Sequence, residues 1–363
     1  METTQGIGSR PRAIGVSCQG RSDAAFRVRL ELPGRGLVDH GVDLDLLPLF
    51  PGEQARRFRA ANPFGKARIL AASRRQLKRE LLARGEGAST VVVQRGVDLA
   101  PQLTLERAAT RGRRLIYDVD DAVWLSGGQT GGHPLSGLKG AARRVRWLAE
   151  GAAHTIAGNE ILAEHLAAYG GEVTVVPSLV DPADYVVKAH EQGEVVTLGW
   201  IGSPTTAPYL GRVAGALERF ARDSERPVRL IAVGGTPPEL AGVRVEERAW
   251  SPEAEGRALA EMDVGLMPLA DTPWTRGKCA YKALQYMAAG IPPLADDVGV
   301  SAATVEGAGY AVSGAEGWRE ALEALAADAT LRDRLGAAGR RRVEEEFSPA
   351  RWLPTLAAIV GGE

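Results

Sequence analysis

The sequence predicts an α/β protein with two domains, each built on a parallel β-sheet covered by helices. Short runs of β-branched and apolar residues alternate along the chain with longer Ala-, Leu-, Arg- and Glu-rich stretches of helical period, which is the pattern of βα units. The length of 363 residues exceeds what one hydrophobic core usually holds. Two domains of about 150 to 200 residues each are therefore expected.

The expected strands form two series. In the first half of the chain they cover residues 13–18, 42–48, 90–94, 114–117, 154–157 and 172–176. In the second half they cover residues 195–201, 228–233, 243–246, 264–268 and 291–294. Between the two series, residues 177–194 contain two prolines and several polar residues that interrupt any periodic pattern. We place the domain boundary there, with a first domain over residues 1–180 and a second over 181–347.

A terminal helix is expected over residues 348–363. Ser348 as a cap and Pro349 at the first helical position form a helix-start signature. This helix is a candidate for packing back on the first domain, with a break at Pro354.

The composition argues against several classes of protein, among them membrane-spanning, disulfide-rich and nucleic-acid-binding proteins. Apolar residues make up 45% and charged residues 25% of the chain, and the formal net charge is -1, so basic groups that bind an anionic partner must act locally. Only Cys18 and Cys279 are present, which argues against a disulfide framework or a zinc site. The N-terminus lacks an apolar signal core, and no run of about 18 apolar residues occurs. We expect a cytoplasmic protein without a transmembrane segment or a nucleic-acid partner.

The segment at residues 274–295, WTRGKCAYKALQYMAAGIPPLA, is the most informative part of the sequence. A loop that contains Arg276, Lys278 and Cys279 leads into a helix expected to start near Ala280. The free N–H groups and the dipole at a helix start favour an anion, and nearby basic side chains add charge-assisted bonds to phosphate oxygens. This segment therefore predicts a site for a diphosphate that needs no metal ion.

Two polar residues on the expected helix extend this site. Lys282 and Gln285 lie three positions apart and share one helix face. On that face Lys282 would reach a phosphate, while Gln285 would hydrogen-bond a ribose hydroxyl. The alternative is that both side chains simply face solvent.

The same segment resembles the donor-binding motif of the group-1 retaining glycosyltransferases of the GT-B fold, which have a pattern like K-x-x-E-Y-M-A-x-G-x-P. The matching residues are Lys282, Gln285, Tyr286, Met287, Ala288, Gly290 and Pro292. The resemblance continues upstream through residues 264–268 and 157–181, and it covers the chain from about residue 117 to its end. It implies two Rossmann-like domains with an interdomain cleft, in which the second domain binds the donor and the first the acceptor.

One departure from the family pattern concerns two glutamates that the family commonly has eight positions apart. Gly277 and Gln285 occupy those positions here. The contact of the first glutamate with the sugar hydroxyls must then be made otherwise, or the donor differs, or activity is reduced.

The loop after the strand expected at residues 195–201 is a second candidate for donor binding. Gly202 would let the backbone approach a ligand, and Ser203, Thr205 and Thr206 offer hydroxyl and N–H groups to phosphate. A plain capped helix start is the alternative. Relatives often carry two basic phosphate ligands in this loop, and their absence leaves that charge to the basic residues of the segment at 274–295.

Three aspartates, Asp118, Asp120 and Asp121, follow one another at the carboxyl end of an expected buried strand. That edge of an open α/β sheet is where ligands bind. Carboxylates so close together repel one another unless they meet cations, donors or solvent. The resemblance implies that Asp120 and Asp121 are the catalytic pair, one of which orients the sugar or acts as base for the acceptor hydroxyl. Relatives often have a His-Asp pair there, so Asp120 is a second departure.

Two alternatives remain open at this stage. The Asp-x-Asp pattern of Asp118 and Asp120 also fits the nucleophile and acid/base of a haloacid-dehalogenase-like, Mg²⁺-dependent phosphatase, with residues 294–312 as its later Mg²⁺ segment. Against this, Ala122 stands where a threonine-like residue is expected. The missing glutamates suggest a non-catalytic protein that binds nucleotide sugars.

Several single residues are weaker candidates. Trp250 precedes a Ser-Pro helix start where the family contacts the nucleotide base, so stacking on the base and ordinary packing are both open. Arg27 and Arg29 would face the acceptor if a helix starts near Asp23, although helix-surface charge is the simpler interpretation. His133, in a glycine-rich loop, is a further acceptor-side candidate.

The sequence thus predicts a glycosyltransferase that moves a sugar from a nucleoside-diphosphate sugar to a hydroxyl or amine of a small molecule or glycan. The resemblance implies retention of anomeric configuration and no required metal or other cofactor. The departing diphosphate would be stabilised by positive groups and N–H dipoles.

Overall fold

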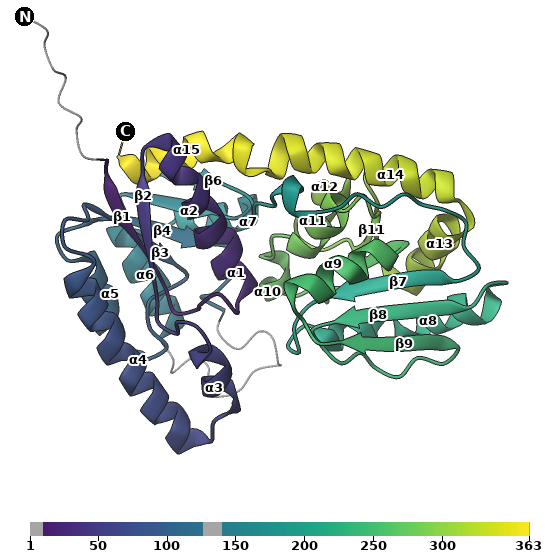
Figure 1. The fold of residues 1–363 in the computed structure, drawn as a ribbon, viewed down its shortest axis with the longest axis horizontal. Helices are drawn as coiled ribbons and strands as arrows, with labels where there is room; N and C mark the ends of the chain where they lie inside the picture. Colours follow the sequence, from purple (N-terminus) through teal and green to yellow (C-terminus); the bar gives the residue numbers. More distant parts are fainter. Residues whose placement is uncertain (1–9, 126–139, 363) are drawn as a thin grey trace, which may run out of the picture. The chain divides into compact units, whose positions relative to one another are not determined.

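The computed structural model describes residues 10–125 and 140–362, which divide into two compact units. In these ranges the first unit comprises residues 10–125, 140–179 and 352–362, and the second comprises 180–351. Each unit is built on a six-stranded sheet with flanking helices (Figure 1). The α/β class predicted from the sequence is confirmed.

All strand pairs in the sheet of the first unit are parallel, in the order β2-β1-β3-β4-β5-β6. The strands are β1 (Arg12–Ser17), β2 (Asp43–Pro48), β3 (Thr90–Gln94), β4 (Arg114–Val119), β5 (His154–Ala157) and β6 (Val173–Val175). The α-helices are α1 (Ala24–Phe26), α2 (Leu32–Leu37), α3 (Gln54–Ala60), α4 (Pro63–Ala83), α5 (Thr104–Thr110), α6 (Ala141–Gly151) and α7 (Glu160–Ala167), with a π-helical turn, Arg27–Glu31, between α1 and α2. The strand order reverses between β1 and β3, so the carboxyl ends of these strands are where a ligand is expected.

The sheet of the second unit is also parallel, in the order β12-β11-β10-β7-β8-β9. Its strands are β7 (Val196–Ile201), β8 (Val228–Val233), β9 (Val243–Arg248), β10 (Val264–Met267), β11 (Pro293–Asp296) and β12 (Tyr310–Val312). Its α-helices are α8 (Leu210–Asp223), α9 (Pro252–Glu261), α10 (Pro273–Arg276), α11 (Tyr281–Ala288), α12 (Ser301–Val305), α13 (Gly314–Ala327) and α14 (Ala329–Arg342).

Counted from its own first strand, the second sheet has the order 3-2-1-4-5-6 of dinucleotide-binding folds. The order reverses between β7 and β10. The segments that leave the carboxyl ends of these two strands begin at Gly202 and Pro268. They include the two stretches that the sequence singles out for donor binding, so the topology supports placing a ligand beside them.

Apolar side chains bury both faces of the second sheet. On one face Trp200 of β7 packs with α8 and α13 in a cluster that also holds Phe220 and Trp318. On the other face Ile201 and Ile231 of the sheet pack with α9 and with Tyr286 of α11. Helix α11 is buried from Ala283 to Ala288, so its position relative to the strands is fixed by the core.

The terminal helix α15 runs from Pro349 to Gly361. Its Leu353, Leu356 and Ile359 lie in one hydrophobic cluster with residues of β1, β3 and β4 of the first unit. The expected break at Pro354 is wrong, because the helix continues through it, with Leu353 and Leu356 on either side packed in this cluster. Ser348 also acts differently from the expected cap, since its hydroxyl donates backward to the Glu344 carbonyl at 2.7 Å.

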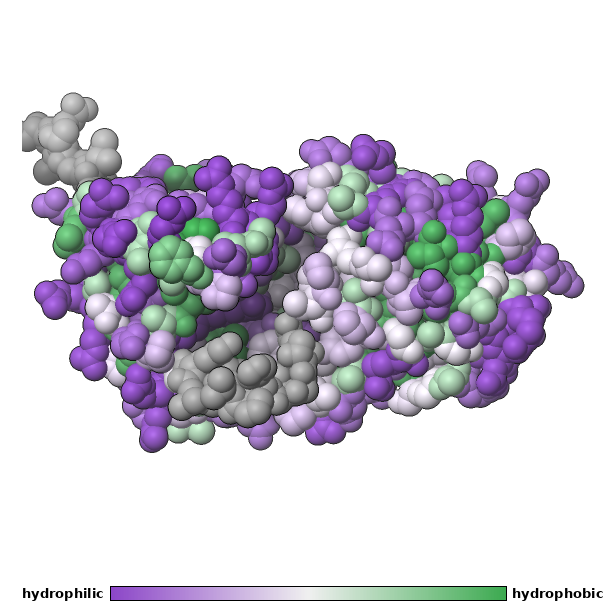
Figure 2. All heavy atoms as spheres, turned by 90° about the horizontal axis from the view of Figure 1, so that it is seen from below, coloured by the Kyte–Doolittle hydropathy of each residue, from purple (hydrophilic) through white to green (hydrophobic). Residues whose placement is uncertain are grey.

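The sequence missed strand β12, which has only three residues, all half-buried. A short strand at the edge of a sheet lacks the continuous apolar run by which the inner strands are recognised. None of the helices in the described ranges combines the length and hydropathy needed to cross a membrane. Hydrophilic side chains prevail on the face of the molecule shown in Figure 2, with hydrophobic ones between them.

Candidate functional sites

Lys282 lies in the first turn of α11, in the second unit. Its Nζ is 5.9 Å from the centre of the Trp200 ring, and the side chain is half-buried. A cation over an aromatic face is attracted by the ring quadrupole. Lys282 therefore lies near the Trp200 ring of β7, and its side chain is partly buried and not fully exposed to solvent.

The loop before α11 carries the other predicted phosphate ligands. Lys278 Nζ lies 5.4 Å from the centre of the Trp274 ring, and Cys279 is half-buried and not part of a disulfide. Arg276, by contrast, is exposed and makes a bidentate pair with Asp271, with Nε and one Nη at 2.6 and 2.9 Å from the carboxylate oxygens. Arg276 would have to give up this pair to bind phosphate, whereas Lys282 is already positioned by packing.

Gln285 does not face solvent either. It is 4% exposed, and its amide nitrogen donates to Glu255 Oε1 at 2.7 Å and to the Tyr185 hydroxyl at 3.4 Å. The other carboxylate oxygen of Glu255 accepts from Trp250 Nε1 at 2.6 Å. Burial raises the pKa of Tyr185 to about 12, and the Glu255 charge adds to the shift. A carboxylate from α9 thus lies beside the position where the family commonly has a glutamate on α11.

We call Trp250, Glu255 and Gln285 the α9–α11 cluster. Ser251 caps α9 by accepting from the Ala254 N–H at 3.1 Å, as its Ser-Pro sequence predicts. This cap fixes the start of α9 and therefore the direction of Glu255 one turn later. Glu255 was not predicted from the sequence, although it follows Trp250 closely, in the helix that comes after β9.

The loop after β7 folds on itself. The Ser203 N–H donates to Thr206 Oγ1 at 3.2 Å, and the hydroxyls of Ser203 and Thr205 are 2.8 Å apart. A Cβ at Gly202 would lie 2.2 Å from a ring carbon of Trp200, so packing alone requires glycine there. Ligand approach is not needed to explain Gly202, and its place in a donor site, like those of Ser203 and Thr205, remains a proposal.

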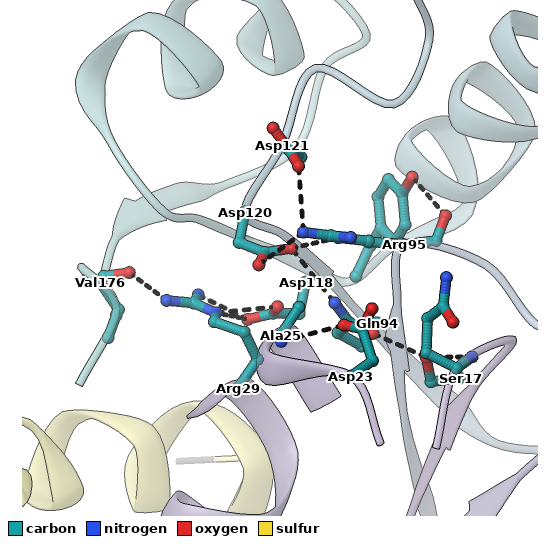
Figure 3. Close-up of polar contacts among 12 residues, drawn as sticks. Ser17, Asp23, Ala25, Arg29, Gln94, Arg95, Asp118, Asp120, Asp121 and Val176 are labelled. Carbon is teal, nitrogen blue, oxygen red and sulfur yellow. Dashed lines mark hydrogen bonds and ion pairs between the residues drawn. The ribbon is translucent and has the colours of Figure 1, made fainter. Parts of the chain in front are cut away.

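In the first unit, polar residues meet at the carboxyl ends of β1, β3 and β4 (Figure 3). Ser17 donates to Gln94 Oε1 at 2.6 Å, across the pair of strands at which the order reverses, and Gln94 donates to Asp120 Oδ1 at 3.1 Å. Arg95 binds both oxygens of Asp120 at 2.6 and 2.9 Å and reaches Asp121 Oδ2 at 3.2 Å. One guanidinium therefore joins two of the three aspartates.

Arg95 has an unusual backbone, with φ at 60°, in the left-handed region that residues other than glycine seldom adopt. Its carbonyl accepts from the Tyr117 hydroxyl at 3.2 Å, and its N–H donates to the Asp118 carbonyl at 2.9 Å. These bonds hold the turn that aims the guanidinium at Asp120. Arg95 was not predicted from the sequence. It directly follows β3, so it lies at a strand end just as the aspartates do.

The third aspartate, Asp118, is paired with Arg29. The guanidinium lies 3.0 and 2.6 Å from the two carboxylate oxygens and also donates to the carbonyls of Val176 and Pro177 at 2.7 and 2.8 Å. Both side chains are buried, at 3% and 4% exposure. The expectation that Arg29 is helix-surface charge is wrong, because the helix starting after Asp23 turns this residue inward.

These pairs decide the charge states of the aspartates. Burial by itself raises the pKa of Asp120, but the charge and hydrogen bonds of Arg95 outweigh burial, and the pKa falls below its usual value. Burial raises the pKa of Asp118, and Arg29 offsets this only in part. Arg29 and Arg95 together contact all three carboxylates. Repulsion among the aspartates therefore does not by itself imply a bound ligand. Asp120, ionised and bound on both oxygens, is better suited to orienting a ligand than to accepting a proton.

Of the two acceptor-side candidates, Arg27 and His133, only Arg27 lies within the described residues. Arg27 is half-buried, and one of its Nη atoms donates to the Arg21 carbonyl at 2.9 Å. His133 lies outside the described residues. Within residues 10–125 and 140–362, no group of three or more His, Cys, Asp or Glu side chains is arranged to hold a metal ion.

Known structures provide an independent comparison. No family model matches the chain, and no curated protein matches it in sequence. The structure is similar to sucrose-phosphate synthase from Thermosynechococcus elongatus, with a TM-score of 0.73 and 14% identity over 96% of this chain and 98% of that one. It is similar to Anabaena HepE, solved with UDP and glucose, with a TM-score of 0.66 and 12% identity over 97% and 100%. A glycosyltransferase from Rickettsia africae gives a TM-score of 0.64 and 10% identity over 97% and 98%.

These similarities cover almost the whole chain and include both sheets. The chain therefore has the GT-B fold that the sequence predicted. The proteins that share the fold are glycosyltransferases, which agrees with the resemblance to the group-1 family read from the segment at 274–295.

Proposed function

We propose that the protein is a glycosyltransferase that transfers a sugar from a nucleoside-diphosphate sugar to an acceptor hydroxyl or amine. The observation that carries this proposal is the placement of Lys282 and the α9–α11 cluster in the second unit, at the carboxyl edge of a sheet with dinucleotide-binding strand order. The complexes of Anabaena HepE with UDP, glucose and UDP-glucose support a nucleotide sugar as the donor.

The proposed donor site assigns a part of the nucleotide to each group. Lys282 and Lys278 bind the diphosphate, aided by the hydroxyls of Ser203 and Thr205. Trp250 contacts the base through its ring, while its indole N–H holds Glu255. The Gln285 amide donates to Glu255 and so holds this carboxylate beside α11. There Glu255 accepts bonds from the ribose hydroxyls, in place of a glutamate on α11.

The proposed role of Lys282 is to stabilise the negative charge of the departing diphosphate. As the glycosidic bond to the diphosphate breaks, negative charge grows on the phosphate oxygens, and a preorganised ammonium group stabilises it without a metal ion. Lys282 is preorganised because Trp200 and the buried helix α11 hold it. Retention of configuration is part of the proposal and rests on the family resemblance.

In the first unit we propose that the group formed by Arg95, Asp120 and Asp121 orients the sugar or the acceptor. The guanidinium fixes both carboxylates at the edge where the strand order reverses. This role needs hydrogen-bond geometry and not a high pKa, in keeping with the lowered pKa of Asp120.

The phosphatase alternative is disfavoured by the contacts of Asp118. A nucleophilic aspartate must present a free oxygen to phosphorus. Here Arg29 binds both oxygens of Asp118, and the Asp118 side chain is 4% exposed. We therefore do not assign Asp118 a catalytic role.

The proposed function is tested by binding followed by turnover. Thermal shift against uridine, guanosine, adenosine and thymidine diphosphates should identify one that raises the melting temperature. The matching nucleotide sugars should then release nucleoside diphosphate in the presence of EDTA. Binding without release from any donor and acceptor would favour the non-catalytic alternative, and activity that EDTA abolishes would contradict metal independence.

Exchanging the partners of the α9–α11 cluster tests the ribose contact. Gln285→Glu places two carboxylates about 2.7 Å apart, and we expect nucleotide affinity to fall about 10- to 100-fold through like-charge repulsion. The exchange variant Glu255→Gln with Gln285→Glu restores one carboxylate and one amide and should recover most of the affinity. Calorimetry with the nucleoside diphosphate and its 2′,3′-dideoxy analogue measures this. Equal losses for both ligands would show that the cluster does not contact ribose.

A further inference from the structure

Helices α3 and α4 of the first unit carry a strong local charge in a chain whose net charge is -1. Residues 53–84 contain ten arginines and lysines and only two glutamates. Helix α4 lies at the outer side of its unit in Figure 1. Its Ser73, Leu77 and Leu81 are buried, which fixes the face that it turns to solvent.

The solvent-facing side of α4 is composed only of cationic and apolar side chains. At about 100° per residue, the exposed residues from Phe64 to Ala83 form one stripe that is roughly 160° wide. We call this stripe the α4 basic face, and its members are Phe64, Ala67, Arg68, Ala71, Ala72, Arg75, Lys78, Arg79, Leu82 and Ala83. It contains no acidic residue, because Glu80 points to another side of the helix.

The four cations of this face are not neutralised by the protein. Within the described residues Arg68, Arg75, Lys78 and Arg79 form no ion pair, whereas Arg74 and Arg84, at the margins, pair with Asp98 and Asp45. A helix face that is merely solvated usually mixes acidic and basic residues, which gain from i,i+4 pairing. The α4 basic face lacks that mixture.

Two large apolar side chains lie in the same stripe. Phe64, in the first turn, is 83% exposed, and Leu82, in the last turn, is 72% exposed. They are 18 residues apart, which places them about 27 Å from each other along the helix. An exposed aromatic and an exposed aliphatic side chain on the same face as Arg and Lys can enter the acyl region of a bilayer while the cations meet anionic headgroups. A nucleic-acid backbone would engage the cations but leave Phe64 and Leu82 in water.

We propose that the α4 basic face binds the surface of an anionic lipid bilayer, with Phe64 and Leu82 inserted among the acyl chains and the four cations at the headgroups. A second copy of this chain is a poor occupant, because two such faces repel each other. The proposal does not depend on the assignment of the donor site.

The test is flotation of the full-length protein with vesicles of phosphatidylcholine that contain about 30% phosphatidylglycerol. We expect binding to these vesicles, little binding to pure phosphatidylcholine, and release at about 1 M NaCl. Replacing Arg68, Arg75, Lys78 and Arg79 by Gln should lower the partition coefficient about 100-fold or more. Replacing Phe64 and Leu82 by Ser and Gln should lower it about tenfold or more with all charges kept.

The matched control changes four exposed arginines of the second unit, Arg212, Arg219, Arg244 and Arg257, to Gln, with the same change in net charge. It should bind as the unaltered protein does, and thermal melts should show each variant folded. The proposal is overturned if the α4 variants still float, if the control loses binding equally, or if duplex DNA displaces the protein from the vesicles at equal charge concentration.

Discussion

Replacing Lys282 by Ala is expected to lower kcat/KM for the nucleotide sugar by about 10²- to 10³-fold, which corresponds to about 3 to 4 kcal/mol of transition-state stabilisation. The ammonium group of Lys282 lies 5.9 Å from the centre of the Trp200 ring, and in the proposed donor site it is the cation that meets the departing diphosphate. Its removal leaves developing negative charge without its partner. Steady-state release of nucleoside diphosphate measures the loss.

Lys282→Met separates the charge from the packing. Methionine retains an unbranched apolar side chain at this position, while it removes the cation. We expect Lys282→Met to be as inactive as Lys282→Ala with an unchanged melting temperature, and Lys282→Arg to recover part of the rate. Full turnover by the Met variant would mean that Lys282 serves only to pack on Trp200.

The fold was predictable because the inner strands of both sheets are buried on both faces. Strands such as Thr90–Gln94 and Val228–Val233 consist mainly of buried apolar residues, with Arg229 as an exception in the second, and the helices between the strands retain their period. The break expected at Pro354 shows where local rules stop: packing of Leu353 and Leu356 on the first unit keeps that segment helical. Strand β12 was missed because three half-buried residues carry no such run.

The candidate sites were predictable in position but not in their pairings. The sequence predicted that Asp120 and Lys282 follow the carboxyl ends of parallel strands, and they do so in the structure, where such ends share one edge of a sheet. No sequence rule shows that Arg95 will bind Asp120, or that Gln285 will donate to Glu255 thirty residues away. Such contacts depend on the packing of α9 against α11 and on the backbone turn at Arg95, and both are tertiary.

The buried pair of Arg29 and Asp118 carries the largest expected effect on stability. Arg29→Met leaves the Asp118 side chain, which is 4% exposed, without its cation and removes a donor from the Val176 and Pro177 carbonyls. Breaking a buried ion pair from one side costs about 3 to 5 kcal/mol, so the unfolding free energy of the first unit should fall by that amount. Urea denaturation followed by circular dichroism measures it.

Removing both charges should cost less than removing one, because the penalty comes from the unpaired ion. We expect Arg29→Met combined with Asp118→Leu to regain part of the stability that Arg29→Met alone loses. The exposed i,i+4 pair of Arg146 and Glu150 is the control, and Arg146→Met should leave the denaturation curve unchanged. A single variant at Arg29 as stable as the unaltered protein would show that Asp118 takes up a proton or finds another partner, and that the pair does not organise the strand ends where Asp120 and Asp121 lie.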